Sequence, residues 1–144
     1  LALAGDAAAE MPAIVELVKG PWQGRAGLDT TRAIVRAFVD HWDEHHAVLQ
    51  LRNLAADRGD KRFVRVRRDA LGPFLDRLAA AIAAAKTDGQ LAADLHPYVA
   101  AASIVSMLER LAHAHSDLES FDVTRADVIE TCARLFHQIV TGRS

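Results

Sequence analysis

Two histidines and a glutamate lie close together in one short stretch of the sequence, at His41, Glu44 and His45. They form the pattern His-x-x-Glu-His, in which the histidines are four residues apart and therefore share one face of a helix. Imidazole nitrogens spaced in this way can coordinate zinc together. The first question that these residues raise is whether this helix holds a metal ion.

The rest of the sequence does not favour a metal enzyme. Five-residue patterns often arise by chance, and the flanks of this one contain neither a recognisable third ligand nor a peptidase cleft. His113 and His115 would face different sides of a helix, and His137 is isolated in the sequence. No Ser-His-Asp arrangement, paired carboxylates or glycine-rich phosphate loop is recognisable either. We therefore predict no metal site, no cofactor and no catalytic residue, and hence no enzyme.

Composition narrows the class of protein further. The 144 residues carry 17 basic and 19 acidic side chains, and this net charge of −2 disfavours direct binding to a nucleic-acid backbone. The basic run from Lys61 to Arg68 lies among acidic residues, so we interpret it as a solvated helix face. The single cysteine, Cys132, excludes an internal disulfide and indicates a reducing compartment. The longest apolar stretch ends at Glu109 and is too short to span a membrane, so we predict a soluble, cytoplasmic chain with no membrane partner.

The periodicity of the apolar residues predicts an all-α chain. They recur at spacings of three and four, and no segment alternates as a strand would. We expect helices over residues 1–17, 30–46, 47–56, 61–86, 97–112 and 125–141, which gives an antiparallel bundle of about six helices in a single domain, 1–144. Gly20-Pro21 and the stretch Gly24 to Gly27 predict a loop that contains Trp22. Pro73 predicts a kink or a break in the longest helix.

The last two predicted helices have apolar faces too broad for one chain of this length to cover. Thr124 as N-cap with Asp127 in the first turn, and Gly142 as a left-handed stop, delimit the final helix. We therefore predict a symmetric homodimer in which these two helices form a four-helix interface with a second copy. Its predicted contacts are small and apolar residues at helical spacing: Ala101, Val105, Leu108, Ala112, Leu135, Phe136 and Ile139.

These features together resemble the ligand-binding and dimerisation domain of the TetR family of bacterial transcriptional regulators. The resemblance covers nearly the whole chain and is carried by the stretches Ala33 to Trp42, Asp88 to Leu91, Asp94 to Pro97, Ala100 to Ala112 and Val128 to Phe136. The helix-turn-helix that is diagnostic of the family lies N-terminal to this domain, and the sequence given does not contain it. Leu1 to Leu3 look like the start of the helix that follows those DNA-binding helices, so we expect the chain to be cut from a longer protein.

The resemblance implies the regulatory domain of a one-component transcriptional regulator, which we expect to be a repressor. A small apolar or amphiphilic effector would change the spacing of two DNA-reading heads, which must lie about 34 to 36 Å apart to reach successive major grooves. Operator DNA would be bound only through the missing N-terminal domain. We expect the effector pocket to be lined by large side chains from converging helices: Ile14, Phe38, Trp42, Phe74, Leu78, Met107 and Leu111.

Two alternatives stay open from the sequence. A stripe of Phe, Met and Leu at helical spacing is typical of an ordinary core as well as of a pocket. The chain could also be a stand-alone helical dimer that serves as a protein-interaction or small-molecule carrier module. A cavity of roughly several hundred cubic ångströms between the helices would favour effector sensing, and a solid core would favour a scaffold.

Overall fold

The computed structural model of the chain describes the backbone of residues 2–143 and the side chains of residues 5–143. Leu1 and the side chain of Leu3, which entered the prediction for the N-terminal helix, lie outside this range. Within it, the predicted all-α class is confirmed, and none of the described helices is long and apolar enough to cross a membrane. The helices are α1 (Ala2–Ala8), α2 (Met11–Glu16), α3 (Gly24–Asp57), α4 (Lys61–Thr87), α5 (Pro97–Ala114) and α6 (Arg125–Thr141), with the 3-10 segments η1 (Leu17–Lys19) and η2 (His115–Phe121).

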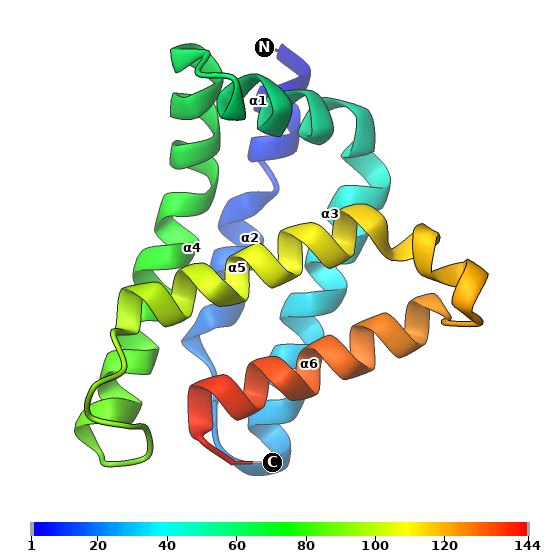
Figure 1. The fold of residues 1–144 in the computed structure, drawn as a ribbon. Helices are drawn as coiled ribbons and strands as arrows, with labels where there is room; N and C mark the ends of the chain where they lie inside the picture. Colours follow the sequence, from blue (N-terminus) through cyan, green and yellow to red (C-terminus); the bar gives the residue numbers. More distant parts are fainter. Residues whose placement is uncertain (1, 144) are drawn as a thin grey trace.

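The helices form two layers (Figure 1). α5 and α6 run in opposite directions across one face of α2, α3 and α4, and they pack against α3 and α4 more than against each other. The core lies between the two layers because each helix turns its apolar side toward the other layer. Its largest fully buried side chains come from the four long helices: Ile34, Phe38, Phe74, Leu78, Ile82, Ile104, Leu108 and Phe136.

The predicted N-terminal helix is interrupted. The sequence predicts one helix over residues 1–17, whereas the structure has a turn at Ala9 and Glu10 between α1 and α2. Pro12 is the reason, because it has no N–H to donate to the carbonyl of Ala8 and its ring would collide with that carbonyl in a continuous helix. The turn leaves the Glu10 side chain free to reach across to α3.

α3 is longer than predicted at its start and bent near the predicted end. Gln23 is its N-cap, so the glycines at 24 and 27, which predicted a loop, lie in the first turn of the helix. The sequence predicts a helix end near His46, and His45 has non-helical dihedrals (φ −118°, ψ 25°) at the point where two helical segments join. The prediction of two segments was therefore sound, although the chain continues from one into the other without a loop.

α4 runs through Pro73 without a break. Of the two outcomes predicted for this residue, a kink or a break, the break is therefore wrong. Pro73 lies on the solvent-exposed side of the helix, where the unpaired carbonyl four residues earlier can bind water. Asp60 caps the helix by accepting a hydrogen bond from the backbone N–H of Arg62 at 3.0 Å. The helix ends at Asp88 and Gly89, as predicted.

The ends of α6 are confirmed as predicted. The Thr124 hydroxyl accepts from the N–H of Asp127 at 3.1 Å, and the Asp127 carboxylate accepts from the N–H of Thr124 at 2.9 Å, which together form a capping box. Gly142 terminates the helix in the left-handed conformation with φ 68°.

Candidate functional site

A mostly apolar groove lies between the two N-terminal helices and α4. It has a volume of about 570 Å³ and is called the α2–α4 groove here. Small and apolar side chains from α1, α2 and α4 form its walls: Ala8, Met11, Pro12, Val15, Val66, Ala70 and Pro73. Its size falls within the range of about 300–1,000 Å³ that is usual for small-molecule sites.

Three charged side chains give the rim of the α2–α4 groove its polarity. Glu16 comes from α2 and Arg77 from α4, and they meet with the Arg77 Nη1 3.4 Å from the Glu16 carboxylate. Asp69 is the third charged residue of the rim. Lys19 donates a hydrogen bond to Glu16 and, together with Arg77, lowers the pKa of this carboxyl below its usual value. An apolar floor with charges of both signs at the rim suits an amphiphilic molecule.

The seven predicted pocket residues lie beside this groove rather than in it. Phe38 and Phe74 contact each other edge to face in the core, with ring centroids 5.1 Å apart. Ile14, Trp42 and Leu78 are also buried, and Met107 and Leu111 are half-buried against the same core. Their role as effector contacts stays a prediction. Two groove residues, Val15 and Pro73, are the immediate sequence neighbours of the predicted residues Ile14 and Phe74.

Trp42 alone among the seven lines a described cavity, which lies between α3 and α5 and measures about 500 Å³. Its indole N–H donates to Glu109 Oε2 at 2.6 Å, and the Arg52 guanidinium donates to Glu109 Oε1 at 3.1 Å. Burial lowers the pKa of Arg52, whose side chain is only 4% exposed, while the Glu109 carboxylate opposes that shift. This buried ion pair fixes the second segment of α3 against α5.

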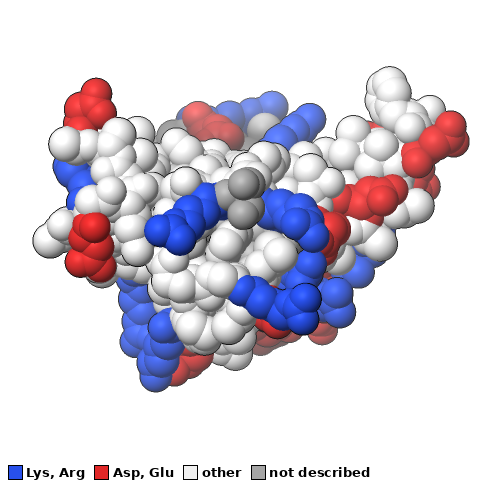
Figure 2. Space-filling model, turned by 90° about the horizontal axis from the view of Figure 1, so that it is seen from below, with Lys and Arg blue, Asp and Glu red and all other residues white. Residues whose placement is uncertain are grey.

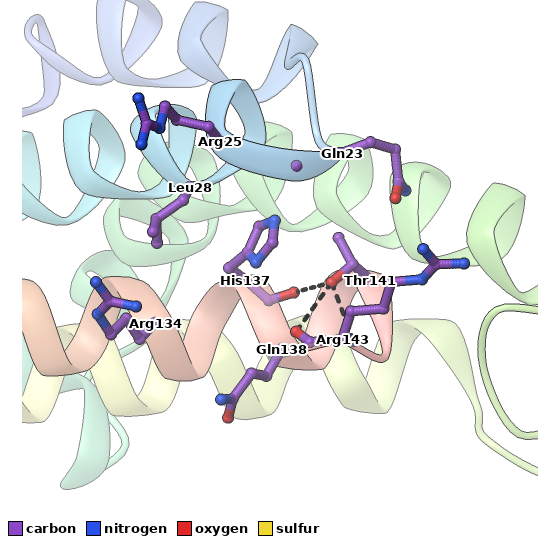
Figure 3. Close-up of a pocket in the computed structure, with 9 residues that line it drawn as sticks. Gln23, Arg25, Leu28, Arg134, His137, Gln138, Thr141 and Arg143 are labelled. Carbon is purple, nitrogen blue, oxygen red and sulfur yellow. Dashed lines mark hydrogen bonds between the residues drawn. The ribbon is translucent and has the colours of Figure 1, made fainter.

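A third cavity, the arginine pocket, lies between the start of α3 and the end of α6 (Figure 3). Its volume is about 470 Å³, and Arg25, Arg134 and Arg143 are among the residues that line it. Seen from this end of the molecule, Lys and Arg side chains gather on the surface (Figure 2). Such an arrangement attracts anionic groups.

One carboxylate reduces the positive charge of the arginine pocket. Glu130 accepts from Arg134 at 2.9 Å and from two nitrogens of Arg32 at 2.8 Å each. The Arg32 hydrogen bonds are the main reason why the pKa of Glu130 falls to about 2. Glu130 is therefore ionised at neutral pH and holds α3 and α6 together on the surface.

The residues predicted for the dimer interface divide into two groups. Ala101, Val105, Leu108, Ala112 and Phe136 are buried inside the single chain, where they pack between the two layers. Leu135 is 44% exposed and Ile139 is half-buried, so these two remain available to a partner. The exposed apolar side chains Tyr98 and Val99 on α5 were not predicted. The interface itself stays a prediction.

The two histidines of the His-x-x-Glu-His pattern do lie on one face of α3, and they meet a residue that sequence reasoning missed. Glu10 reaches from the turn between α1 and α2 and contacts His41 Nδ1 at 2.8 Å and His45 Nε2 at 2.7 Å. These hydrogen bonds lower the pKa of Glu10 below its usual value. Glu44, the glutamate of the pattern, lies to one side, 4.0 Å from His45. No sequence signal connects Glu10 with a helix that begins fourteen residues later.

Comparison with known proteins assigns the chain to a family. The sequence model described as Tetracyclin repressor-like, C-terminal domain, matches residues 14–144, which include α3, α4, α5 and α6 in full. Comparison with curated proteins and with solved structures gives no further match. The chain belongs to the TetR family, as a C-terminal regulatory domain of a transcriptional regulator.

Proposed function

We propose that this chain is the effector-sensing and dimerisation domain of a one-component repressor, and that its effector is a small apolar or amphiphilic molecule bound in the α2–α4 groove. The main support for this proposal is the groove, which has an apolar floor, a charged rim and the volume of a small-molecule site. It lies in a domain that belongs to a family of regulators. The domain recognises its effector and does not transform it.

The position of the groove supports a regulatory role. One wall is α4, which is fixed in the core by Phe74 and Leu78, and the other wall is α1 and α2, which are short and separated by a turn. A ligand that prefers a wider or narrower groove shifts the short helices relative to α4, because only differential affinity for two arrangements can move an equilibrium. In this family the DNA-binding helices precede such a domain, so the shift would reach them through α1.

Filling the groove with a larger side chain should weaken the binding of an amphiphilic probe. We expect Val66→Trp to weaken the binding of 8-anilinonaphthalene-1-sulfonate at least about tenfold, a loss of about 1.4 kcal/mol, because the indole occupies the apolar floor. Fluorescence titration of the purified chain measures this affinity.

The matched control is Val64→Trp, which places the same side chain on α4 two residues away. Val64 is half-buried like Val66 but does not line the groove. Probe affinity should stay within a factor of about two of the wild-type value, because the new side chain lies outside the groove. If both variants bind the probe equally well, the groove is not the site.

The proposed dimer uses the outer faces of α5 and α6. These two helices form one layer, so their sides away from α3 and α4 face solvent (Figure 1). Three of their apolar side chains, Tyr98, Val99 and Leu135, are 46%, 61% and 44% exposed. Exposed apolar side chains on helices of the outer layer support an interface with a second chain. Leu108, by contrast, is only 1% exposed, so a charge placed there would unfold the chain and would not test the interface.

A charge at Leu135 should convert a dimer to a monomer. Leu135→Glu buries an unpaired carboxylate in the interface while leaving the core of the protomer intact, so sedimentation velocity should give the mass of one chain. Leu51→Glu is the control, because Leu51 is 55% exposed but lies on α3, away from the α5–α6 layer. A Leu135→Glu variant that sediments like the wild-type dimer would place the interface elsewhere.

A further inference from the structure

The cluster of Glu10, His41 and His45 brings together three side chains of the kinds that bind transition metals. One ligand atom from each lies within 4.8 Å of the others. They come from separate segments, since His41 and His45 are on consecutive turns of α3 and Glu10 lies in the turn between α1 and α2. The cluster therefore exists only in the folded chain.

The geometry of the cluster is fixed by burial. His41 is 4% exposed and His45 17% exposed, and their rings are held 5.3 Å apart by the helix that carries both. Each Glu10 oxygen faces one ring nitrogen, and among the described residues these two histidines are the only ion-pair partners of Glu10. The carboxylate is thus positioned toward the two imidazoles and is not occupied by a lysine or arginine.

The cluster is also open on one side. A cavity of about 260 Å³ adjoins His45 and is lined by the carboxylates of Asp6 and Glu44 as well as by His46. Glu44 Oε2 lies 4.0 Å from His45 Nε2, which is close enough for it to approach an ion held by that nitrogen, directly or through water. The cavity therefore exposes His45 to solvent beside two carboxylates, which would attract a cation.

We propose that Glu10, His41 and His45 form a binding site for a divalent transition-metal ion of the zinc class. Two imidazoles and one carboxylate make a ligand set that zinc accepts, whereas magnesium and calcium prefer oxygen ligands alone. Bonds of about 2.0–2.1 Å in a tetrahedral arrangement place ligand atoms about 3.3 Å apart. The two contacts of 2.8 and 2.7 Å, each made by a different Glu10 oxygen, would lengthen as the ion replaces the hydrogens between the carboxylate and the rings. The three ligand atoms already lie within 4.8 Å of one another, so the rings and the carboxylate need to adjust by side-chain movement alone.

A bound ion would join two places where the backbone departs from regular helix. Glu10 lies in the turn between α1 and α2, and His45 is the residue at which α3 bends. Metal binding would fix the first against the second, and so restrain the short helices that form one wall of the α2–α4 groove. The metal site does not depend on an effector binding in that groove, so each proposal can fail without the other.

Zinc titration of the metal-free chain, prepared without a histidine tag, tests the proposal. Isothermal titration calorimetry should show saturation at one zinc per chain, and Co²⁺ at the same site should give the visible absorption of a tetrahedral ion. Glu10→Gln and His45→Gln should each weaken zinc binding by more than about tenfold, because glutamine keeps the hydrogen bonding but is a poor ligand. Circular dichroism checks that both variants keep their helices.

The matched control is His115→Gln. His115 Nε2 lies 2.6 Å from the Asp43 carboxylate, so it forms a similar histidine–carboxylate contact but without a second histidine. This variant should bind zinc like the wild type. The proposal is overturned if the wild-type chain binds no zinc stoichiometrically, or if Glu10→Gln and His45→Gln bind it as tightly as His115→Gln.

Discussion

Replacing Glu109 with leucine should lower the free energy of unfolding by about 3–5 kcal/mol, the usual cost of removing one partner from a buried ion pair. The Arg52 guanidinium is 4% exposed and would lose the carboxylate that it contacts at 3.1 Å. It cannot escape the cost by losing its proton at neutral pH, because guanidinium stays charged in proteins. The indole N–H of Trp42 would lose its acceptor as well.

Urea unfolding followed by circular dichroism, at one fixed protein concentration, measures this loss. The informative control is the double variant Arg52→Met with Glu109→Leu, which removes the stranded charge and fills the space with apolar side chains of similar length. We expect it to recover most of the lost stability, since buried pairs are often replaceable by apolar residues at little cost. Equal destabilisation of the single and double variants would show that packing, and not charge, sets the effect.

Local rules predicted the long helices well. The capping residues Thr124 and Asp127, the turn chemistry at Asp88-Gly89 and the apolar periodicity of α4 act within a few residues of chain, so their effect can be read directly from the sequence. The same rules failed where two influences compete. Pro12 interrupts a helix that the apolar pattern would continue, whereas the longer helix α4 runs through Pro73. Both prolines are exposed, so exposure does not explain the difference.

The contacts that make up the candidate sites could not be predicted from local sequence patterns. Glu10 and His41 are separated by 31 residues, and Arg52 and Glu109 by 57. Which side chains meet at such separations depends on how the helices cross, and helical periodicity determines a face but not its neighbour. The histidine pattern therefore predicted that His41 and His45 share one helix face, whereas Glu10, which contacts both of them, could not be identified.

The predicted dimer contacts also show that helical periodicity does not identify what covers an apolar face. An apolar stripe has the same sequence pattern whether it is covered by the chain's own helices or by a second copy. Leu108 and Phe136 are covered within the protomer, whereas Leu135, next to Phe136 in the sequence, faces solvent. A rotation of one residue, about 100° around the helix, separates the core from the surface that we propose for the partner.

The close approach of two segments at Gly27 makes this glycine the most sensitive position near the arginine pocket. A Cβ atom at residue 27 would overlap with the backbone carbonyl of Trp22 and lie 3.0 Å from Nε2 of His137. The Trp22 carbonyl accepts a hydrogen bond from that nitrogen at 3.1 Å, and the Trp22 ring packs on Phe136 with centroids 5.9 Å apart. The missing side chain thus lets the segment before α3 attach to α6.

Gly27→Ala should therefore destabilise the chain by about 3 kcal/mol, the upper end of the usual cost of overpacking, because backbone must move and not merely a side chain. Gly5→Ala is the matched control, since Gly5 also lies in a helix and no atom outside its own helical turn is within 4 Å of an added Cβ. That substitution should stabilise by about 0.5–1 kcal/mol through the lower helix propensity of glycine. Urea unfolding of both variants measures the difference, and a stabilised Gly27→Ala chain would contradict the clash.

The two substitutions change the same residue type within helices, so opposite signs would isolate the contact with Trp22 as the cause. Because that contact holds α6, one of the two helices proposed to form the dimer, the Gly27→Ala chain should also dimerise more weakly, which sedimentation velocity would detect.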